Sequence, residues 1–157
     1  MVAAAAGCQQ VVWLDPVERR WVEELGAMNL LFVLGTGDAA ELVTPPAAGN
    51  LLPGITRDSL LALAAQHGTK VREEPVSIEQ WRDLSLDGTL TEAFATGTAA
   101  VVTPVGAVCD GDDTWRVGTG SAGPVTLRLR DALTAIHTGQ APAPAGWLRT
   151  VAPAAVR

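Results

Sequence analysis

A long apolar segment that ends at Val33 constrains the fold more than any other feature of this sequence. It reads GAMNLLFV, residues 26–33, and a glycine-rich turn follows it directly. A second, shorter extended segment, Glu41–Thr44, comes after that turn. Two extended segments joined by a turn of this kind are typical of a β-hairpin. The sequence therefore predicts a hairpin here, and with it a sheet.

Further strands and helices are predicted on both sides of this hairpin. In chain order they are the end of a helix stopped by Gly7, a buried strand over Gln10–Asp15, a helix from Ile55 to about His67, a strand from Lys70 to about Pro75, a short helix with Ser77 as its N-cap, two strands around a Thr-Gly-Thr turn at 96–98, a hairpin turn at 109–115 and a last helix closed by Gly139. Strands and helices mixed within one core indicate the α+β class, or mixed α/β. With 157 residues the chain is predicted to form one domain, residues 1–157, with an Ala/Pro-rich tail over 139–157.

The composition excludes several classes of function. The net charge is −6 and the arginines are interleaved with acids, so no basic face for nucleic acid is expected. No apolar run reaches the ~20 residues that span a bilayer, so no membrane span is expected either. The start MVAAAAG lacks the cationic region of a signal peptide, and a cytoplasmic protein is expected. Cys8 and Cys109 belong to no CxxC pair; they are expected to be reduced structural thiols, and no metal site is expected.

Three other patterns indicate structure rather than sites. The sequence GTGSAG, residues 118–123, has the glycine spacing of a dinucleotide site, but the strand and the acidic residue that must follow are missing. The sequence DGDD, residues 110–113, starts like a calcium loop but lacks the required Gly at the sixth position and Glu at the twelfth. His67 and His137 lie just before helix-stopping glycines, where an imidazole complements the helix C-terminus.

The stretch LLPGITRDSLL, residues 51–61, predicts an anion site. A Pro-Gly pair ends the preceding segment, and Ile55, Leu60 and Leu63 then follow a helical period. The first backbone N–H groups of such a helix have no partner within it and are best suited to a phosphate, although an ordinary loop-to-helix junction reads the same way. The spacing of apolar residues does not decide where the Glu24 side chain lies. A carboxylate just before the apolar strand either enters a core cleft or faces solvent.

Several blocks, taken in order, resemble a known family. They are VVWLD, ERRWVEELGAMNLLFV, LVTPP, LLPGITRDSLL, EAFATGTAAVVTPV and GPVTLRLRDAL, and they lie between about Gly7 and Trp147. The chain is similar to the large domain of the branched-chain amino-acid aminotransferases, of the class IV fold of pyridoxal-phosphate enzymes. The resemblance implies a mixed sheet or barrel-like β core with flanking helices.

The resemblance also implies site residues. Glu24 corresponds to the family's glutamate that pairs with the pyridine nitrogen of the cofactor and keeps the ring protonated. The helix start after residue 54 and the turn after residue 96 correspond to its phosphate-binding cup, made of backbone N–H groups and a threonine hydroxyl. The candidate cofactor-binding residues are Glu24, Ile55, Thr56, Gly97, Thr98 and Ala99. Glu24 and Thr98 are also the candidate catalytic residues.

The sequence differs from the family pattern at the lysine that forms the Schiff base. In the family the Schiff-base lysine lies upstream of the VVWLD block, and this sequence starts within the helix that follows it. Lys70 is the only lysine, and it lies where the family has the start of a surface strand, so it is expected to be a poor substitute nucleophile. Without the lysine the proton transfer loses its base, and the chain is not expected to transaminate alone.

Two hypotheses of function follow. In the first, the chain is a shortened, stand-alone domain reassigned to cofactor-independent chemistry of the isomerase, cyclase or lyase type, for example in specialised-metabolite biosynthesis; a hydrophobic metabolite would lie in an open apolar cleft beside Glu24 and Thr98. In the second, it is a non-catalytic fragment or subunit of an aminotransferase that needs a lysine-bearing partner. No cofactor is expected as a catalytic requirement, while residual binding of pyridoxal phosphate or phosphate fits the cup. Because removal of a domain exposes apolar surface, a homodimer is expected.

Overall fold

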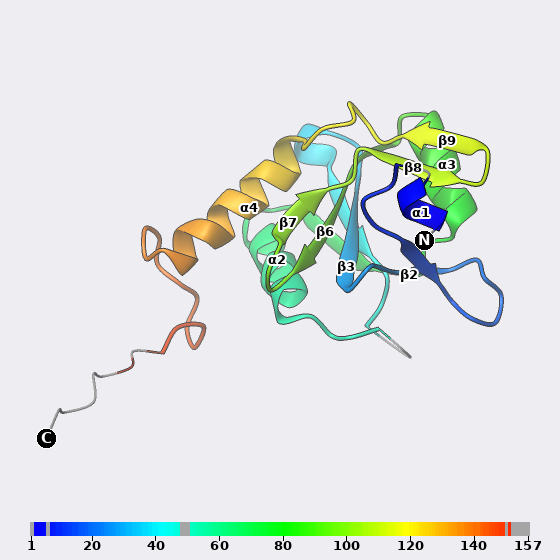
Figure 1. Cartoon of the computed structure of the whole chain (residues 1–157). Helices are drawn as coiled ribbons and strands as arrows, with labels where there is room; N and C mark the ends of the chain where they lie inside the picture. Colours follow the sequence, from blue (N-terminus) through cyan, green and yellow to red (C-terminus); the bar gives the residue numbers. More distant parts are fainter. Residues whose placement is uncertain (1, 6, 48–50, 150, 152–157) are drawn as a thin grey trace, which may run out of the picture.

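A seven-stranded sheet forms the centre of the part of the chain that the structure describes (Figure 1). The structure is a computed structural model that describes residues 2–5, 7–47, 51–149 and 151. The long apolar segment of the sequence forms strand β3 (Met28–Leu34). The other strands of this sheet are β1 (Val12–Leu14), β2 (Val22–Leu25), β4 (Glu41–Thr44), β5 (Lys70–Glu73), β6 (Leu90–Gly97) and β7 (Val101–Pro104).

Strand β3 organises this sheet because three strands pair with it. On one edge β6 runs antiparallel to β3 along nearly its whole length, from Asn29 opposite Thr96 to Leu34 opposite Leu90. On the other edge β2 pairs with the start of β3 and β4 with its end, both antiparallel. Strands β4 and β5 are parallel, and helix α2 (Ile55–Gln66) makes the crossover that a parallel pair requires.

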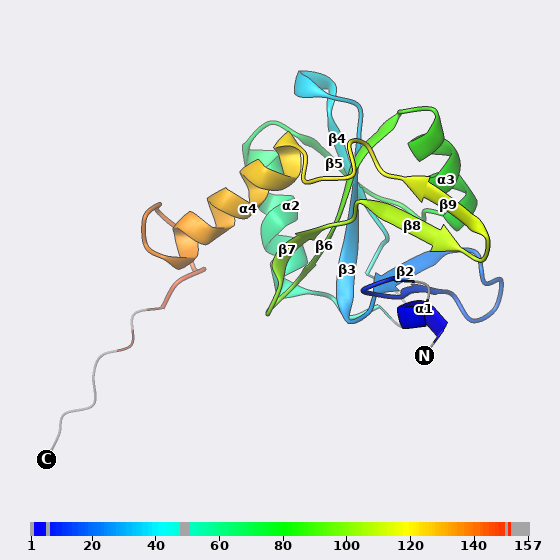
Figure 2. The ribbon, with the colours of Figure 1, turned by 45° about the horizontal axis from the view of Figure 1, so that its top comes forward.

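The side chains of β3 alternate between two apolar cores on opposite faces of the sheet. Leu31 and Val33 belong to the core under helix α2 and helix α4 (Pro124–His137). Leu30 and Phe32 belong to the core under helix α3 (Ile78–Leu86) and the hairpin of β8 (Ala107–Asp110) and β9 (Asp113–Arg116). Figures 1 and 2 show these two layers on either side of the sheet. The remaining elements are α1 (Val2–Ala5) and the 3-10 turn η1 (Gly37–Ala39).

Local signals set the helix boundaries. Ser77 caps α3 with a capping box: its Oγ accepts a hydrogen bond from the Gln80 N–H at 3.1 Å, and its own N–H donates to Gln80 Oε1 at 2.9 Å. Gly68 and Gly139 have positive φ and follow α2 and α4, as left-handed residues at helix ends do. These predicted boundaries are confirmed, and so is the α+β class.

Two details of the prediction are wrong. The segment Gln10–Asp15 is not a buried strand: only Val12–Leu14 is extended, and Trp13 is 56% exposed, because β1 lies at the edge of the sheet and pairs with β2 alone. Ile55 does not join the apolar face of α2 but is 85% exposed. Arg57 takes a buried position in that first turn instead.

Candidate functional site

The predicted site residues come from separate segments that meet near the start of β3. A row of directly paired residues crosses the sheet there, from Trp13 on β1 to Glu24 on β2, Asn29 on β3 and Thr96 on β6. Paired residues in neighbouring strands point to the same face of a sheet. All four side chains therefore lie on the face that α2 and α4 cover further along β3.

Glu24 and Asn29 hold the loop that leads into α2. Glu24 Oε1 accepts a hydrogen bond from the Leu52 N–H at 3.3 Å, and Asn29 Nδ2 donates to the Leu52 carbonyl oxygen at 3.0 Å. Gly54 lies so close to Asn29 that a Cβ at Gly54 would overlap Asn29 Oδ1. Because Asn29 is only 6% exposed, these contacts hold the start of α2 beside Glu24.

The first turn of α2 presents backbone N–H groups without a side-chain cap. Gly54 is the N-cap residue, and it has no side chain that could accept from the first N–H groups of the helix. Ile55 is exposed and Thr56 is half-buried, so their backbone lies at the surface of the protein. Such a helix start carries partial positive charge and suits an anion.

The second part of the predicted cup lies next to the same end of β3. Gly97 ends β6, and Thr98 and Ala99 lie in the exposed turn to β7. A Cβ on Gly97 would come within 3.3 Å of Met28 Cγ, so a larger residue would press on the first residue of β3. The structure thus brings the turn and the start of α2 to the same end of β3, and Thr98 is exposed there.

The Glu24 side chain is neither fully inside a core cleft nor fully exposed to solvent, the two positions that the sequence left open. Its side chain is half-buried, with one carboxylate oxygen turned to the Leu52 N–H. Trp13, its cross-strand neighbour, is held in place by a hydrogen bond from its Nε1 to the Gly26 carbonyl oxygen at 3.0 Å. A carboxylate in this position can accept a strong hydrogen bond from a protonated nitrogen.

Lys70 lies at the opposite end of the sheet. Its Nζ donates to Glu41 Oε1 at 2.6 Å, and Glu41 pairs with Leu34, the last residue of β3. Glu24 pairs with Asn29 near the first residue of that strand. Five residues along an extended strand span about 17 Å. Lys70 therefore does not reach the candidate site.

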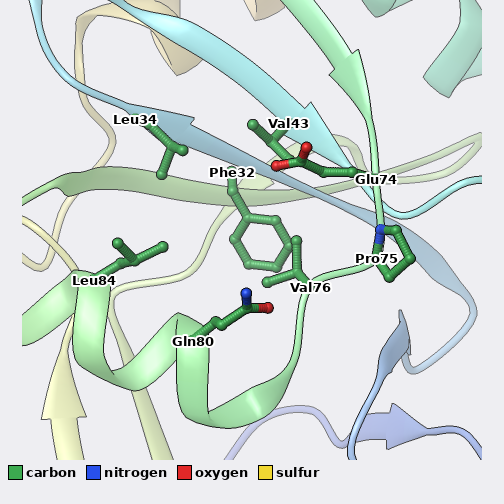
Figure 3. A pocket seen from close by; sticks show the side chains of 8 residues that line it. All are labelled: Phe32, Leu34, Val43, Glu74, Pro75, Val76, Gln80 and Leu84. Atoms are coloured by element: carbon green, nitrogen blue, oxygen red, sulfur yellow. The ribbon is translucent and has the colours of Figure 1, made fainter.

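Two hollows are lined by other residues than those of this group. The first has a volume of about 50 Å³ and lies on the α3 face; Figure 3 shows the Phe32 ring in its middle, with the Glu74 carboxylate and the Gln80 amide on opposite sides. The second, of about 190 Å³, is lined by three prolines and by four residues of two other segments, which are Trp21, Val22, Glu23 and Leu51. Neither is lined by Glu24 or Thr98, so neither is the open apolar cleft that the first hypothesis places there.

Two buried polar residues of this region were missed by the sequence reasoning. Asn29 fastens the loop before α2, as described above. Arg57 is 2% exposed and donates through Nη2 to the Pro45 carbonyl oxygen at 3.0 Å and to Glu73 Oε2 at 2.6 Å, which ties the start of α2 to the ends of β4 and β5. The sequence did contain a signal for each residue: Asn29 interrupts an apolar strand, and Arg57 lies on the apolar face of a helix. A polar residue in such a position is buried only with partners for its polar atoms.

The residues present fit the non-covalent ends of pyridoxal phosphate. The uncapped turn of α2 and the Thr98 hydroxyl are donors for a phosphate, and Glu24 is an acceptor for a protonated ring nitrogen. They do not fit its covalent attachment, because the only lysine is bound to Glu41 at the far end of the sheet. In the described ranges there is no group of three or more His, Cys, Asp or Glu that could hold a metal ion, and no helix there is long and apolar enough to cross a membrane.

The chain is similar to known proteins over nearly its whole length. The family model for amino-transferase class IV matches residues 2–108. A branched-chain-amino-acid aminotransferase of Mycobacterium tuberculosis is 53% identical over 146 residues, which are 93% of this chain and 40% of that protein. Branched-chain-amino-acid aminotransferase 2 of Bacillus subtilis is 40% identical over 151 residues, 96% of this chain and 40% of the relative.

Solved structures show the same likeness in three dimensions. The branched-chain amino acid aminotransferase of Escherichia coli superposes with a TM-score of 0.76 at 38% identity, over 95% of this chain and 45% of that one. A branched-chain amino acid aminotransferase from T.th., solved with pyridoxamine 5′-phosphate, gives a TM-score of 0.73 at 37% identity, over 90% of this chain and 42% of that one. The chain spans about 40% of the length of the curated relatives that it matches.

Proposed function

The chain belongs to the class IV aminotransferase family, and on that premise we propose that it forms the phosphate- and ring-nitrogen-binding part of a branched-chain aminotransferase site. This is the second of the two hypotheses drawn from the sequence. The observation that carries it is the hydrogen bond from the Leu52 N–H to Glu24 Oε1, at 3.3 Å. That contact keeps the acceptor for a ring nitrogen beside the helix start that suits a phosphate.

Each residue of the group has a separate task in this proposal. When bound, pyridoxal phosphate supplies the electron sink for chemistry at the α-carbon of an amino acid. The N–H groups of Ile55 and Thr56 and the Thr98 hydroxyl bind and orient the phosphate. Glu24 holds a proton on the ring nitrogen, and Trp13 beside it shields the carboxylate from water on one side.

The base for proton transfer lies outside the group of residues that this chain brings together. Lys70 is paired with Glu41, and no other lysine is present in the sequence. We therefore propose that a lysine from another polypeptide, or from a further part of a longer chain, completes the site. The substrate class, branched-chain amino acids, is proposed from the relatives alone.

Titration of the chain with pyridoxal phosphate tests this proposal. We expect saturable binding, seen in the cofactor absorbance and in quenching of tryptophan fluorescence, with inorganic phosphate as a competitor. Treatment with borohydride should leave no adduct on a lysine, because Lys70, the only lysine of the sequence, is paired with Glu41 at the far end of the sheet. A reduced adduct on Lys70 would contradict the position of the site, and an absence of saturable binding would contradict the function.

Substitution of Glu24 makes the test specific. Glu24→Gln removes a charge-assisted hydrogen bond, worth about 1.5–3 kcal/mol, so affinity for pyridoxal phosphate should fall by at least about tenfold. Glu23→Gln is the matched control, because it changes the net charge by the same amount at the neighbouring residue. Strand β2 has a bulge at Glu23, so this residue is not paired with any residue of β1. Equal losses in both variants would mean that overall charge, and not the Glu24 contact, supports binding.

The first hypothesis stays a prediction. Cofactor-independent chemistry on a hydrophobic metabolite also uses Glu24 and Thr98 as its residues, and a fold alone does not choose a reaction. If the double variant Glu24→Gln with Thr98→Ala kept every activity and ligand affinity of the parent chain, that hypothesis would fail.

A further inference from the structure

Asn29 and Thr96 are directly paired on β3 and β6, and each donates a side-chain hydrogen bond to the backbone of another segment. Asn29 Nδ2 donates to the Leu52 carbonyl oxygen at 3.0 Å, and Thr96 Oγ1 donates to the Val101 carbonyl oxygen at 2.6 Å. Both residues are buried. A buried polar side chain is normally retained for the partner that it holds, so the two acceptor segments indicate what this pair of residues does.

The contact of Asn29 holds the residue that leads into α2. Leu52 is 72% exposed, so packing does not fix its position. Its carbonyl oxygen is bound to Asn29, and its N–H donates to Glu24 Oε1 at 3.3 Å. Only Pro53 and Gly54 separate Leu52 from the first residue of α2, and the ring of a proline fixes its φ angle. Asn29 therefore sets where the first N–H groups of α2 lie relative to Glu24.

The contact of Thr96 holds the turn between β6 and β7. This turn carries Thr98, whose hydroxyl is the side-chain donor of the candidate cup. Val101 ends the turn with a φ of +56°, a left-handed conformation that a β-branched residue rarely adopts. Such a residue persists only where its surroundings hold it, and residues of this kind cluster at ligand sites. The hydrogen bond from Thr96 holds Val101 and, with it, the turn.

We propose that Asn29 and Thr96 are positioning residues that hold the two walls of the phosphate cup, which are the start of α2 and the turn over residues 97–100. The inference rests on the proposed function, which supplies the ligand that the walls bind. Because Asn29 and Thr96 are buried and donate to backbone carbonyl groups, they act through the backbone and do not touch the ligand. Donors that are held in place before binding bind more tightly, since binding does not have to order them.

Threonine-to-valine substitutions on β6 test this role, because valine keeps the shape of threonine and lacks its hydroxyl. Thr96→Val should lower the affinity of the full chain for pyridoxal phosphate and for inorganic phosphate by about tenfold each. Titration followed by the cofactor absorbance, with phosphate as the competitor, measures both affinities. Thr96→Ser keeps the hydroxyl and should restore them.

Thr91→Val is the matched control. Thr91 lies at the other end of β6, and its Oγ1 donates to the Gly35 carbonyl oxygen at 2.7 Å. The substitution removes the same kind of hydrogen bond far from the cup, so urea unfolding should show a loss of stability similar to that of Thr96→Val. Both ligand affinities of Thr91→Val should stay within about twofold of the parent chain.

Asn29→Leu tests the other wall, and it decides the question if Thr96→Val does not fold. Leucine keeps the branched shape of asparagine and removes the donor to Leu52. The affinity for pyridoxal phosphate should fall by about tenfold and that for inorganic phosphate clearly less, because only the larger ligand spans both the helix start and Glu24. A loss of folded protein alone would lower the two affinities by the same factor.

Saturable binding by the parent chain decides the proposed function, and the comparison of variants decides the roles of Asn29 and Thr96. A parent chain that bound neither ligand would overturn both. Binding by the parent chain with unchanged affinities in Thr96→Val and Asn29→Leu would overturn the positioning roles alone. An equal loss of affinity in Thr91→Val would do the same.

Discussion

Asp15 shows how one side chain can shape a loop between two strands. Its two carboxylate oxygens accept hydrogen bonds from the backbone N–H groups of Val17, Glu18, Arg20 and Trp21, at 2.6–3.1 Å. These bonds, led by those from Arg20 and Trp21, lower the pKa of Asp15 from 3.8 to about 2. The carboxylate therefore organises the connection that brings β1 to β2, and with it Trp13 to Glu24.

The lowered pKa predicts a pH dependence of stability. Because the pKa of Asp15 is lower in the folded state, its contribution is present above pH 3.8 and is lost as the pH falls toward 2. Asp15→Asn should lower the free energy of unfolding at neutral pH, and its difference from the parent chain should shrink between pH 4 and pH 2. Urea unfolding at a series of pH values measures this.

The control for this prediction is Asp112→Asn. Asp112 is exposed in the turn between β8 and β9. Its substitution should change the free energy of unfolding by no more than about 0.5 kcal/mol. A difference between Asp15→Asn and the parent chain that stayed constant from about pH 7 to about pH 2 would rule out the carboxylate as the cause.

At the scale of elements, a strand residue decides how α4 begins. Glu92, on β6, is 6% exposed and accepts hydrogen bonds from the Val125 N–H at 3.0 Å, the Thr126 N–H at 2.8 Å and the Thr126 hydroxyl at 2.6 Å. Gly123 leaves room for this contact, because a Cβ there would overlap the carboxylate. A carboxylate at a helix N-terminus satisfies donors that the helix cannot, so Glu92 docks α4 on the sheet.

Glu92→Gln should destabilise the protein by about 2 kcal/mol, because an amide NH₂ group would then face backbone N–H donors in a buried position. Chemical denaturation measures the change. Glu18→Gln, at an exposed position, is the control and should stay within about 0.5 kcal/mol of the parent chain. If the two variants were equally stable, Glu92 would not be the cap that holds α4.

At the scale of the whole molecule, exposed apolar side chains predict self-association. Trp13, Leu52 and Ile55 are 56%, 72% and 85% exposed, and the hydrogen bond from the Leu52 N–H to Glu24 brings two of the segments concerned together. Exposed apolar side chains that gather into a patch are normally covered by another protein surface. We propose a homodimer, and light scattering at micromolar concentration should give twice the monomer mass. A monomer across that range would refute the proposal.

The local elements could be predicted because their signals are local. The N-cap at Ser77, the helix ends at Gly68 and Gly139, and the hairpin after Val33 each depend on a few neighbouring residues. The edge position of β1 could not be predicted in this way, since whether a strand is central or at an edge depends on the other strands in the sheet. Trp13 was therefore expected to be buried and is not.

For the candidate site, the sequence was sufficient to recognise the family resemblance, to predict the residue types of the cup and to show that Lys70 is the only lysine. The binding of Glu24 to the loop before α2, and the position of Lys70 at the far end of the sheet, became clear from the three-dimensional structure alone. Each of these contacts joins segments far apart in the chain. Strand register and layer packing create such contacts, and a local pattern of residues carries no information about either.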